Sequence, residues 1–136
     1  MENSLPATCP CRELDEHKPS YAQCCQPFHL GRRDKTALPE TAQALMRSRY
    51  SAFVLLLEQY LLDTWHVSTR PQDLGLDEEL EWSGLEIIKT RAGGAQASRG
   101  VVEFTAHYGR GANAGSQHEV STFVKEDGAW YYVDAL

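Results

Sequence analysis

All four cysteines of this 136-residue chain lie near its start, as Cys9-Pro10-Cys11 and Cys24-Cys25. A disulfide framework would distribute its bridges over the fold, whereas a cluster of this kind favours a metal site. Four thiolates suit tetrahedral zinc, with Zn–S distances of ~2.3 Å and no coordination position left for a substrate. The pattern therefore predicts a structural Zn²⁺ site that orders a segment with little hydrophobic core of its own.

The same cluster allows other ligand sets and other roles. In an extended segment Cys9 and Cys11 would point to the same side, and the turn-rich residues after them would fold back to present the second pair. His29 could replace Cys25 as a ligand, and His17 is a further candidate. Four buried free thiols, a redox role for the adjacent pair and a catalytic zinc are the alternative interpretations.

Charge and hydropathy exclude several classes of partner. The formal net charge of −6 argues against non-specific binding to nucleic acid, which needs a surplus of Lys and Arg. The basic cluster of Arg32, Arg33 and Lys35 is interpreted as a solvated loop. The N-terminus lacks the pattern of a secretory signal, and the longest apolar run, residues 52–57, is too short to span a bilayer. We expect a cytoplasmic protein with no membrane segment, in a compartment that keeps thiols reduced.

The middle of the chain has helical periodicity. Apolar residues from Ala42 to Leu61 are three and four positions apart, which predicts an amphipathic helix. Pro39 suits the first turn of this helix. Additional leucines widen the apolar stripe, so either the helix is buried on two sides or it breaks near Leu57–Glu58 into a pair, which is the interpretation that we favour.

The last third of the chain has the composition of β-strands. Four segments rich in β-branched and aromatic residues predict strands at residues 82–90, 100–108, 118–125 and 130–134. Asp127-Gly128 predicts a tight hairpin between the last two. Helices followed by consecutive antiparallel strands make an α+β domain. We therefore predict a zinc knuckle at residues 1–35 and an α+β domain at residues 36–136.

Arg49 continues the apolar stripe of the predicted helix, where a charged side chain is costly unless it is paired. The candidate partners are Glu103, Glu119 and Asp134. Strand alternation puts Glu119 on the same face as Phe123, and hence toward the core if Phe123 is buried. We predict a buried pair between Arg49 and a carboxylate that ties the helix to the sheet.

A cavity in the α+β domain offers an alternative function. Such a cavity would bind a small molecule or carry out acid–base chemistry of the dehydratase or isomerase type. The candidate cavity residues are Arg49, Trp65, His66, Glu103 and Glu119. Trp82 is a further candidate wall, and His107 and His118 are further candidate acid–base groups. No two of these residues form a known motif, so no catalytic residue is assigned and a non-catalytic role is preferred.

Two stretches resemble the SEC-C zinc motif, found at the C-terminus of the preprotein translocase ATPase SecA. They are CPC at residues 9–11 and YAQCC at residues 21–25. The motif usually reads CxCGSGKKYKKCC, and this sequence differs by a longer insert, residues 12–20, without the Gly-Ser-Gly turn. The resemblance implies that the zinc ligands are Cys9, Cys11, Cys24 and Cys25. It also implies a docking role, since the motif of the translocase ATPase docks a chaperone.

The remainder resembles the YchJ family of uncharacterised bacterial proteins. The matching strings include LMRSRYSAF at residues 45–53, YLLDTWH at residues 60–66 and WYYVD at residues 130–134. This resemblance implies a fold similar to nuclear transport factor 2 (cystatin-like), with helices packed on a curved antiparallel sheet. It implies no known reaction. We therefore expect a zinc-binding docking module whose partner is another protein, with a small-molecule ligand as the alternative.

Overall fold

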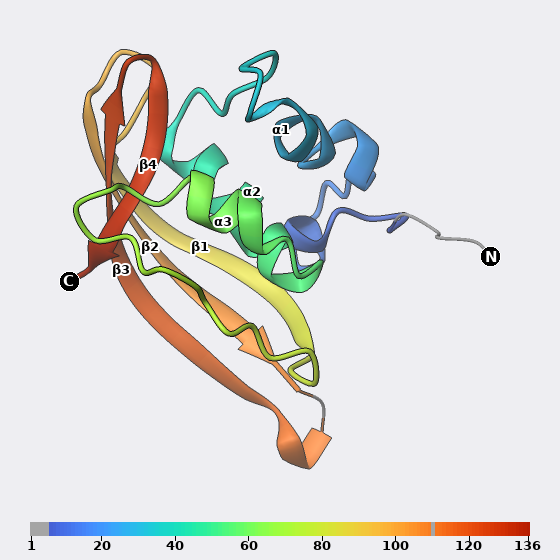
Figure 1. Cartoon of the computed structure of the whole chain (residues 1–136). Coiled ribbons are helices and arrows are strands. Elements are labelled where there is room, and N and C mark those ends of the chain that lie inside the picture. Colours follow the sequence, from blue (N-terminus) through green and yellow to red (C-terminus); the bar gives the residue numbers. More distant parts are fainter. Residues whose placement is uncertain (1–5, 110) are drawn as a thin grey trace.

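An antiparallel four-stranded sheet in the order β1-β2-β3-β4 forms the larger layer of the protein. The structure, a computed structural model, describes residues 6–109 and 111–136. The strands are β1 (Trp82–Ala92), β2 (Arg99–Tyr108), β3 (Gly115–Glu126) and β4 (Ala129–Ala135). Figure 1 shows the sheet curving around the helices, which lie on its concave side. The fold is therefore α+β, as the sequence predicts.

Turns and irregular pairing shape the sheet. All four predicted strands are present, and each is longer than its periodic segment by one to three residues at one or both ends. Asp127 (φ 51°) and Gly128 (φ 81°) both have positive φ, as a two-residue type I′ hairpin requires, so the hairpin prediction is confirmed. The pairing register shifts between Ile87 and Lys89 in β1 and again in β3. Such irregularities bend and twist strands, which explains the curvature.

Three α-helices precede the sheet: α1 (Gln26–Gly31), α2 (Ala42–Val54) and α3 (Glu58–Asp63). The predicted break is confirmed, because α2 ends at Val54 and Leu56 adopts a positive φ of 61° before α3 begins. Pro39 is not in the first helical turn, contrary to the prediction. The hydroxyl of Thr41 instead caps the helix by accepting a hydrogen bond from the Ala44 amide at 3.0 Å.

The N-terminal segment consists of short turns rather than extended chain. Cys9 is itself extended (φ −60°, ψ 135°), but the 3-10 helix η1 (Pro10–Arg12) begins immediately after it. A second 3-10 helix, η2 (Tyr21–Gln23), leads into α1. The prediction of an extended Cys9–Cys11 segment is therefore wrong, because Pro10 suits the first position of a helical turn.

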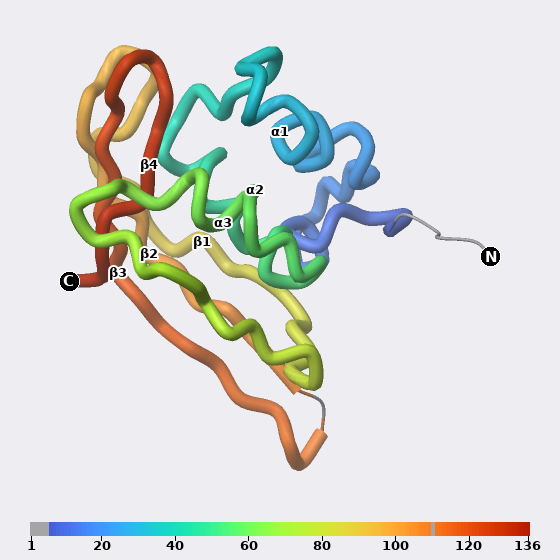
Figure 2. The backbone as a smooth tube through the Cα atoms, viewed as in Figure 1, coloured from blue at the N-terminus to red at the C-terminus, as the bar shows by residue number. Residues whose placement is uncertain are grey.

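The N-terminal segment and the α+β layers share one hydrophobic core. Cys9, Cys11 and Cys25 are at most 1 % exposed, and they belong to the same buried cluster as Leu45 of α2 and Trp130 of β4. The tube view in Figure 2 follows the segment as it passes beside α2. The boundary after residue 35 stays a prediction. Within the described residues, no helix combines the length and apolarity needed to cross a membrane.

Candidate metal centre and adjacent cavity

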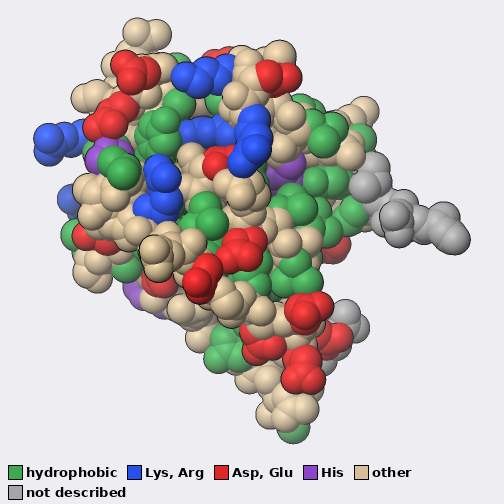
Figure 3. Space-filling view, viewed as in Figure 1, with side chains coloured by type: hydrophobic (Ala, Val, Ile, Leu, Met, Phe, Trp, Pro, Cys, Tyr) green, Lys and Arg blue, Asp and Glu red, His purple; other side chains and the backbone are tan. Residues whose placement is uncertain are grey.

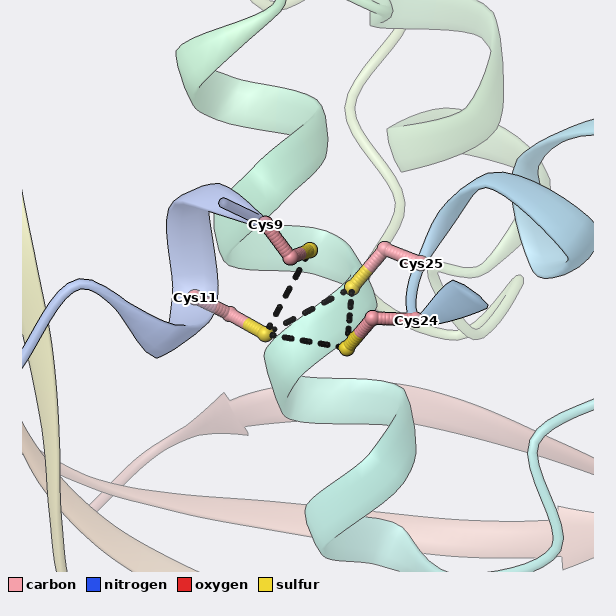
Figure 4. A group of neighbouring side chains, drawn as sticks. All are labelled: Cys9, Cys11, Cys24 and Cys25. Atoms are coloured by element: carbon pink, nitrogen blue, oxygen red, sulfur yellow. Dashed lines mark hydrogen bonds between the residues drawn. The ribbon is translucent and has the colours of Figure 1, made fainter. Parts of the chain in front are cut away.

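The structure brings the four cysteine sulfurs into one cluster, all within 4.8 Å of one another. The sulfur of Cys11 lies 3.7 Å from that of Cys9, 3.7 Å from that of Cys24 and 3.6 Å from that of Cys25. Figure 4 shows the four side chains converging from two segments, η1 and the junction between η2 and α1, with α2 behind them. This arrangement is a candidate metal centre.

Local structure explains how the two pairs meet. The amide of Cys9 donates a hydrogen bond of 2.8 Å to the carbonyl of Pro19, which closes the insert into a loop. Cys24 follows the last residue of η2, and Cys25 is the residue before α1. This loop closure, rather than a Gly-Ser-Gly turn, therefore brings Cys9 and Cys11 close to Cys24 and Cys25.

The sulfur positions fit a tetrahedral metal ion. Zinc with Zn–S distances of ~2.3 Å at the centre of a regular tetrahedron requires sulfur–sulfur edges of about 3.8 Å. Four of the six sulfur–sulfur separations run from 3.6 Å to 4.0 Å, the longest of these four being between Cys24 and Cys25, and all six are within 4.8 Å. Disulfide bonding requires about 2.05 Å, and all four cysteines are free. The cluster can thus bind a metal through four sulfur ligands.

Crowding of the thiols has an electrostatic consequence. Hydrogen bonding with Cys11 lowers the pKa of Cys24 to about 6, whereas hydrogen bonding with Cys24 raises the pKa of Cys11. Four adjacent thiolates repel one another, so the cluster cannot become fully ionised unless a cation sits among the sulfurs.

Two arginines and a serine surround the cluster. Ser51 of α2 donates to the sulfur of Cys25 at 3.3 Å. Arg47, one turn earlier on α2, donates to the carbonyl of Cys11 at 2.8 Å. Burial lowers the pKa of Arg12, but hydrogen bonds with Cys24 and Asp15 raise it above its ordinary value. These cations offset part of the charge that a metal bound by four thiolates carries.

Lys18, another basic residue of the insert, is exposed. The sequence by itself did not identify Arg47 or Ser51, although their spacing of four residues places them on one face of α2.

Neither histidine considered as a ligand joins the sulfur cluster. His17 is exposed. His29 lies 2.8 Å (Nε2) from the carbonyl of Ser48 and 2.6 Å (Nδ1) from the hydroxyl of Tyr21. Because a carbonyl only accepts, Nε2 donates to Ser48, and Nδ1 of the neutral ring accepts from Tyr21. Both nitrogens are therefore used, and His29 does not take the place of Cys25.

We expect His29 to make stability depend on pH. Burial lowers the pKa of His29 below its ordinary value of 6.5, although the Ser48 carbonyl raises it. The stabilisation from the neutral ring is therefore complete above pH 6.5 and is lost as the pH falls through the lower pKa of the folded state. At one pH unit below 6.5, the free energy of unfolding of the wild type should fall by up to about 1.4 kcal/mol relative to that of His29→Gln.

Urea unfolding of the wild type and of His29→Gln, between neutral pH and about pH 5.5, measures this difference in the free energy of unfolding. Both proteins keep all four cysteines, so acid release of a metal affects them equally. A constant difference across the range would contradict the prediction.

A separate cavity of about 230 Å³ lies between α2 and the concave face of the sheet. Its wall is largely aromatic, with a few polar groups. The lining residues are Met46, Arg49, Tyr50, Phe53, Trp65, Trp82, Phe104, Ala106, Gln117, Glu119, Ser121 and Tyr132. Three of the five candidate cavity residues, Arg49, Trp65 and Glu119, lie in this wall, as does Trp82.

The other two candidates lie elsewhere. Glu103 precedes Phe104, a cavity residue, so strand alternation turns it to the opposite face, where it pairs with His118 at 2.7 Å. His66 pairs with Glu126 at 3.0 Å, outside the cavity. His107 and His118 also lie outside it. The cavity therefore contains no histidine among the residues that line it.

Arg49 is buried, being 3 % exposed, but its partners are not those predicted. Its Nη1 donates to the carbonyl of Leu61 at 2.8 Å and to the hydroxyl of Thr64 at 2.7 Å. Its guanidinium carbon lies 5.0 Å and 4.7 Å from the ring centroids of Trp65 and Tyr132. In the described part of the chain, no carboxylate oxygen lies within 4.0 Å of it, so the predicted ion pair is wrong.

The physical reason is the position of the carboxylates. Glu119 lines the cavity with Arg49 but is half-buried, and it accepts a hydrogen bond from Ser121 at 3.3 Å. Asp134 is exposed and accepts from Thr122 at 2.9 Å. The backbone carbonyl at the end of α3 and the two aromatic faces replace a carboxylate in stabilising the buried cation.

Together, these features define a class of protein: an α+β domain similar to nuclear transport factor 2, preceded by a four-cysteine motif. Residues 41–135 match the family model described as YchJ, middle NTF2-like domain. The chain therefore belongs to the YchJ family, as its sequence strings indicate.

Relatives and solved structures agree with this assignment. The chain is 50 % identical over 133 residues to a UPF0225 protein of Chromobacterium violaceum, covering 96 % of this chain and 93 % of the relative. It is 50 % identical over 126 residues to a UPF0225 protein of Streptomyces coelicolor, covering 93 % and 92 %.

Two solved structures are of SEC-C motif containing proteins, each 31 % identical to this chain. The crystal structure from Psychrobacter arcticus has a TM-score of 0.79 and covers 93 % of this chain and 80 % of that one. The solution structure from Rhodopseudomonas palustris has a TM-score of 0.76 and covers 95 % and 97 %. The YchJ-like domain and the SEC-C motif therefore occur together here.

Proposed function

We propose that this protein is a non-catalytic docking module whose N-terminal segment is held in place by a structural zinc ion. The observation that carries the proposal is the convergence of four sulfurs, all within 4.8 Å of one another. Four sulfur ligands fill the coordination sphere of zinc, so the ion orders protein structure and leaves no position for a reacting water. Cys9, Cys11, Cys24 and Cys25 are the proposed ligands.

Metal content tests the first half of the proposal. We expect protein purified under reducing conditions to contain about one zinc per chain by elemental mass spectrometry, with the four thiols protected from Ellman's reagent. Cys24→Ser should reduce the zinc content, whereas His17→Ala, in the same segment, should retain it. A wild-type protein without zinc, or a His17→Ala protein that loses it, would contradict the proposed ligand set.

The surface next to the metal centre supports the second half. Leu30 of α1 is a large apolar side chain that is 74 % exposed, so it is available for contact with a partner. Arg33 follows it closely, with its side chain 72 % exposed. Figure 3 shows Lys and Arg gathered beside hydrophobic side chains over the helical layer, while acidic groups gather toward the lower end of the sheet. The proposed partner is a protein surface that combines apolar and acidic groups, and the cytoplasm is the proposed location.

Matched variants test docking. A partner captured with the wild-type protein should be lost with Leu30→Glu, since a charge placed in an apolar contact is costly. Val67→Glu is the control, because Val67 is 72 % exposed on the connection that follows α3. Both variants should keep their zinc and their melting temperature. Equal capture by both variants would exclude docking through α1.

A further inference from the structure

The cavity and the metal centre lie on different sides of α2. The residues of α2 that line the cavity are Met46, Arg49, Tyr50 and Phe53, whereas Arg47 and Ser51 contact the cysteine segment. The structural role of the metal centre therefore leaves the cavity unexplained.

Arg49 has unused hydrogen-bonding capacity at the cavity. The two hydrogens of Nη1 are taken by Leu61 and Thr64. Arginine has five N–H donors, and in the described residues the other three, on Nε and Nη2, make no hydrogen bond to protein. Nε–H and one hydrogen of Nη2 form the side-on edge of the guanidinium, which matches the two oxygens of a carboxylate.

Arg49 also has no ion-pair partner among the described residues. Burial lowers the pKa of Arg49 to about 10, so the side chain remains a cation at neutral pH. Glu119 is the acidic residue in the wall. It is half-buried, and its carboxylate forms no ion pair with the Arg49 guanidinium. Water screens a partly exposed charge more than a buried one, so the cavity favours an anion with a single charge. A phosphate dianion would require a second cation, and the wall provides only Arg49.

The remainder of the wall suits an aromatic ring. Tyr50 and Trp82 meet edge to face, with ring centroids 6.0 Å apart, and Trp65 meets Tyr132 in the same way at 5.0 Å. A dry cavity of about 150 Å³ holds benzene, so 230 Å³ has room for one ring with a short substituent. Aromatic walls around one buried cation define a site with an apolar part and a single polar anchor.

We propose that this cavity binds a small aromatic monocarboxylate, with Nε and Nη2 of Arg49 donating to the carboxylate and the rings around Trp82 enclosing the aromatic part. The ligand would enter past Gln117, which is the exposed residue of the lining set. This binding site is independent of zinc and of the docking surface on α1.

Benzoate is the probe that tests the proposal. Titration followed by calorimetry and tryptophan fluorescence should give a Kd in about the millimolar range or below. Benzamide, a neutral molecule of the same shape, should bind at least about tenfold more weakly, and so should benzylamine. Glu119→Gln should tighten benzoate binding about threefold, because it removes a like charge.

Two pairs of variants separate binding from folding. Ala106→Leu fills the cavity and leaves every contact of Arg49 in place, so it should weaken benzoate binding at least about tenfold. Thr105→Leu adds similar bulk on the other face of β2, because adjacent strand residues point to opposite faces, and it should leave binding unchanged. Arg49→Lys keeps the charge but loses the planar edge, and should weaken binding by a similar factor.

The outcomes decide the proposal. Absence of benzoate binding to the folded wild-type protein, or equal binding by Ala106→Leu, would overturn it. Tighter binding of benzylamine than of benzoate, weakened by Glu119→Gln, would overturn it in favour of a cation site. Because zinc content is not part of the readout, failure here leaves the proposed metal centre unaffected.

Discussion

Cys25→Ser is expected to release the bound metal and to lower the free energy of unfolding by at least about 3 kcal/mol, since structural zinc contributes on the order of 10 kcal/mol to the folding of small zinc peptides. The sulfur of Cys25 lies 3.6 Å from that of Cys11 and 3.3 Å from the hydroxyl of Ser51. Because Cys25 is 1 % exposed within the shared core, its substitution also places a hydroxyl among apolar groups.

The effect should be concentrated in the N-terminal segment. Without the metal, trypsin should cleave first after Arg12, which lies in the insert that the cysteines close and is followed by Glu13 rather than by proline. The sheet should unfold later, because its strands are paired independently of the cluster.

Thermal unfolding and timed proteolysis measure both effects, with His17→Ala as the control in the same segment. A chelator should reproduce the change in the wild type and cause no further change in Cys25→Ser. A Cys25→Ser protein that keeps the melting temperature and protease resistance of the wild type would contradict a structural role for the metal.

Arg49→Met is expected to lower the free energy of unfolding by about 3 kcal/mol, because hydrogen bonds to a charged group contribute about 1.5–3 kcal/mol each. The substitution keeps the length of the side chain but leaves the carbonyl of Leu61 without its donor in a buried site. It also removes the cation from the faces of Trp65 and Tyr132. Relief from burying a charge offsets part of this loss, so the net effect is smaller than the sum of the contacts.

Arg33→Met is the matched control for Arg49→Met. Arg33 forms an exposed pair with Asp63 at 3.2 Å, and pairs of this kind contribute at most about 1 kcal/mol. Chemical denaturation of both variants measures the difference. If Arg49→Met were as stable as the wild type, the guanidinium would not be a structural tie between α2, α3 and β4.

Features that depend on residues close in sequence could be predicted without the structure. The four cysteines, the order of helices and strands and the hairpin at Asp127-Gly128 all follow from local chemistry. Periodicity of 2 or 3.6 reports which side of an element is apolar, and positive φ at a hairpin depends on two adjacent residues. The start of α2 could not be predicted in this way, because Pro39 suits a first helical turn but the helix begins after Thr41, whose hydroxyl caps it.

By itself, then, the sequence determined the kind of chemistry available: four thiolate ligands, and one arginine inside a helix stripe. The tertiary structure alone decided the partners of these groups. Arg49 contacts a carbonyl and two rings rather than a carboxylate, and Arg47 and Ser51 support the cysteines. Such contacts depend on the curvature of the sheet and on the pairing register of its strands. A register shift of one residue exchanges the two faces of a strand, and no local sequence pattern predicts that shift.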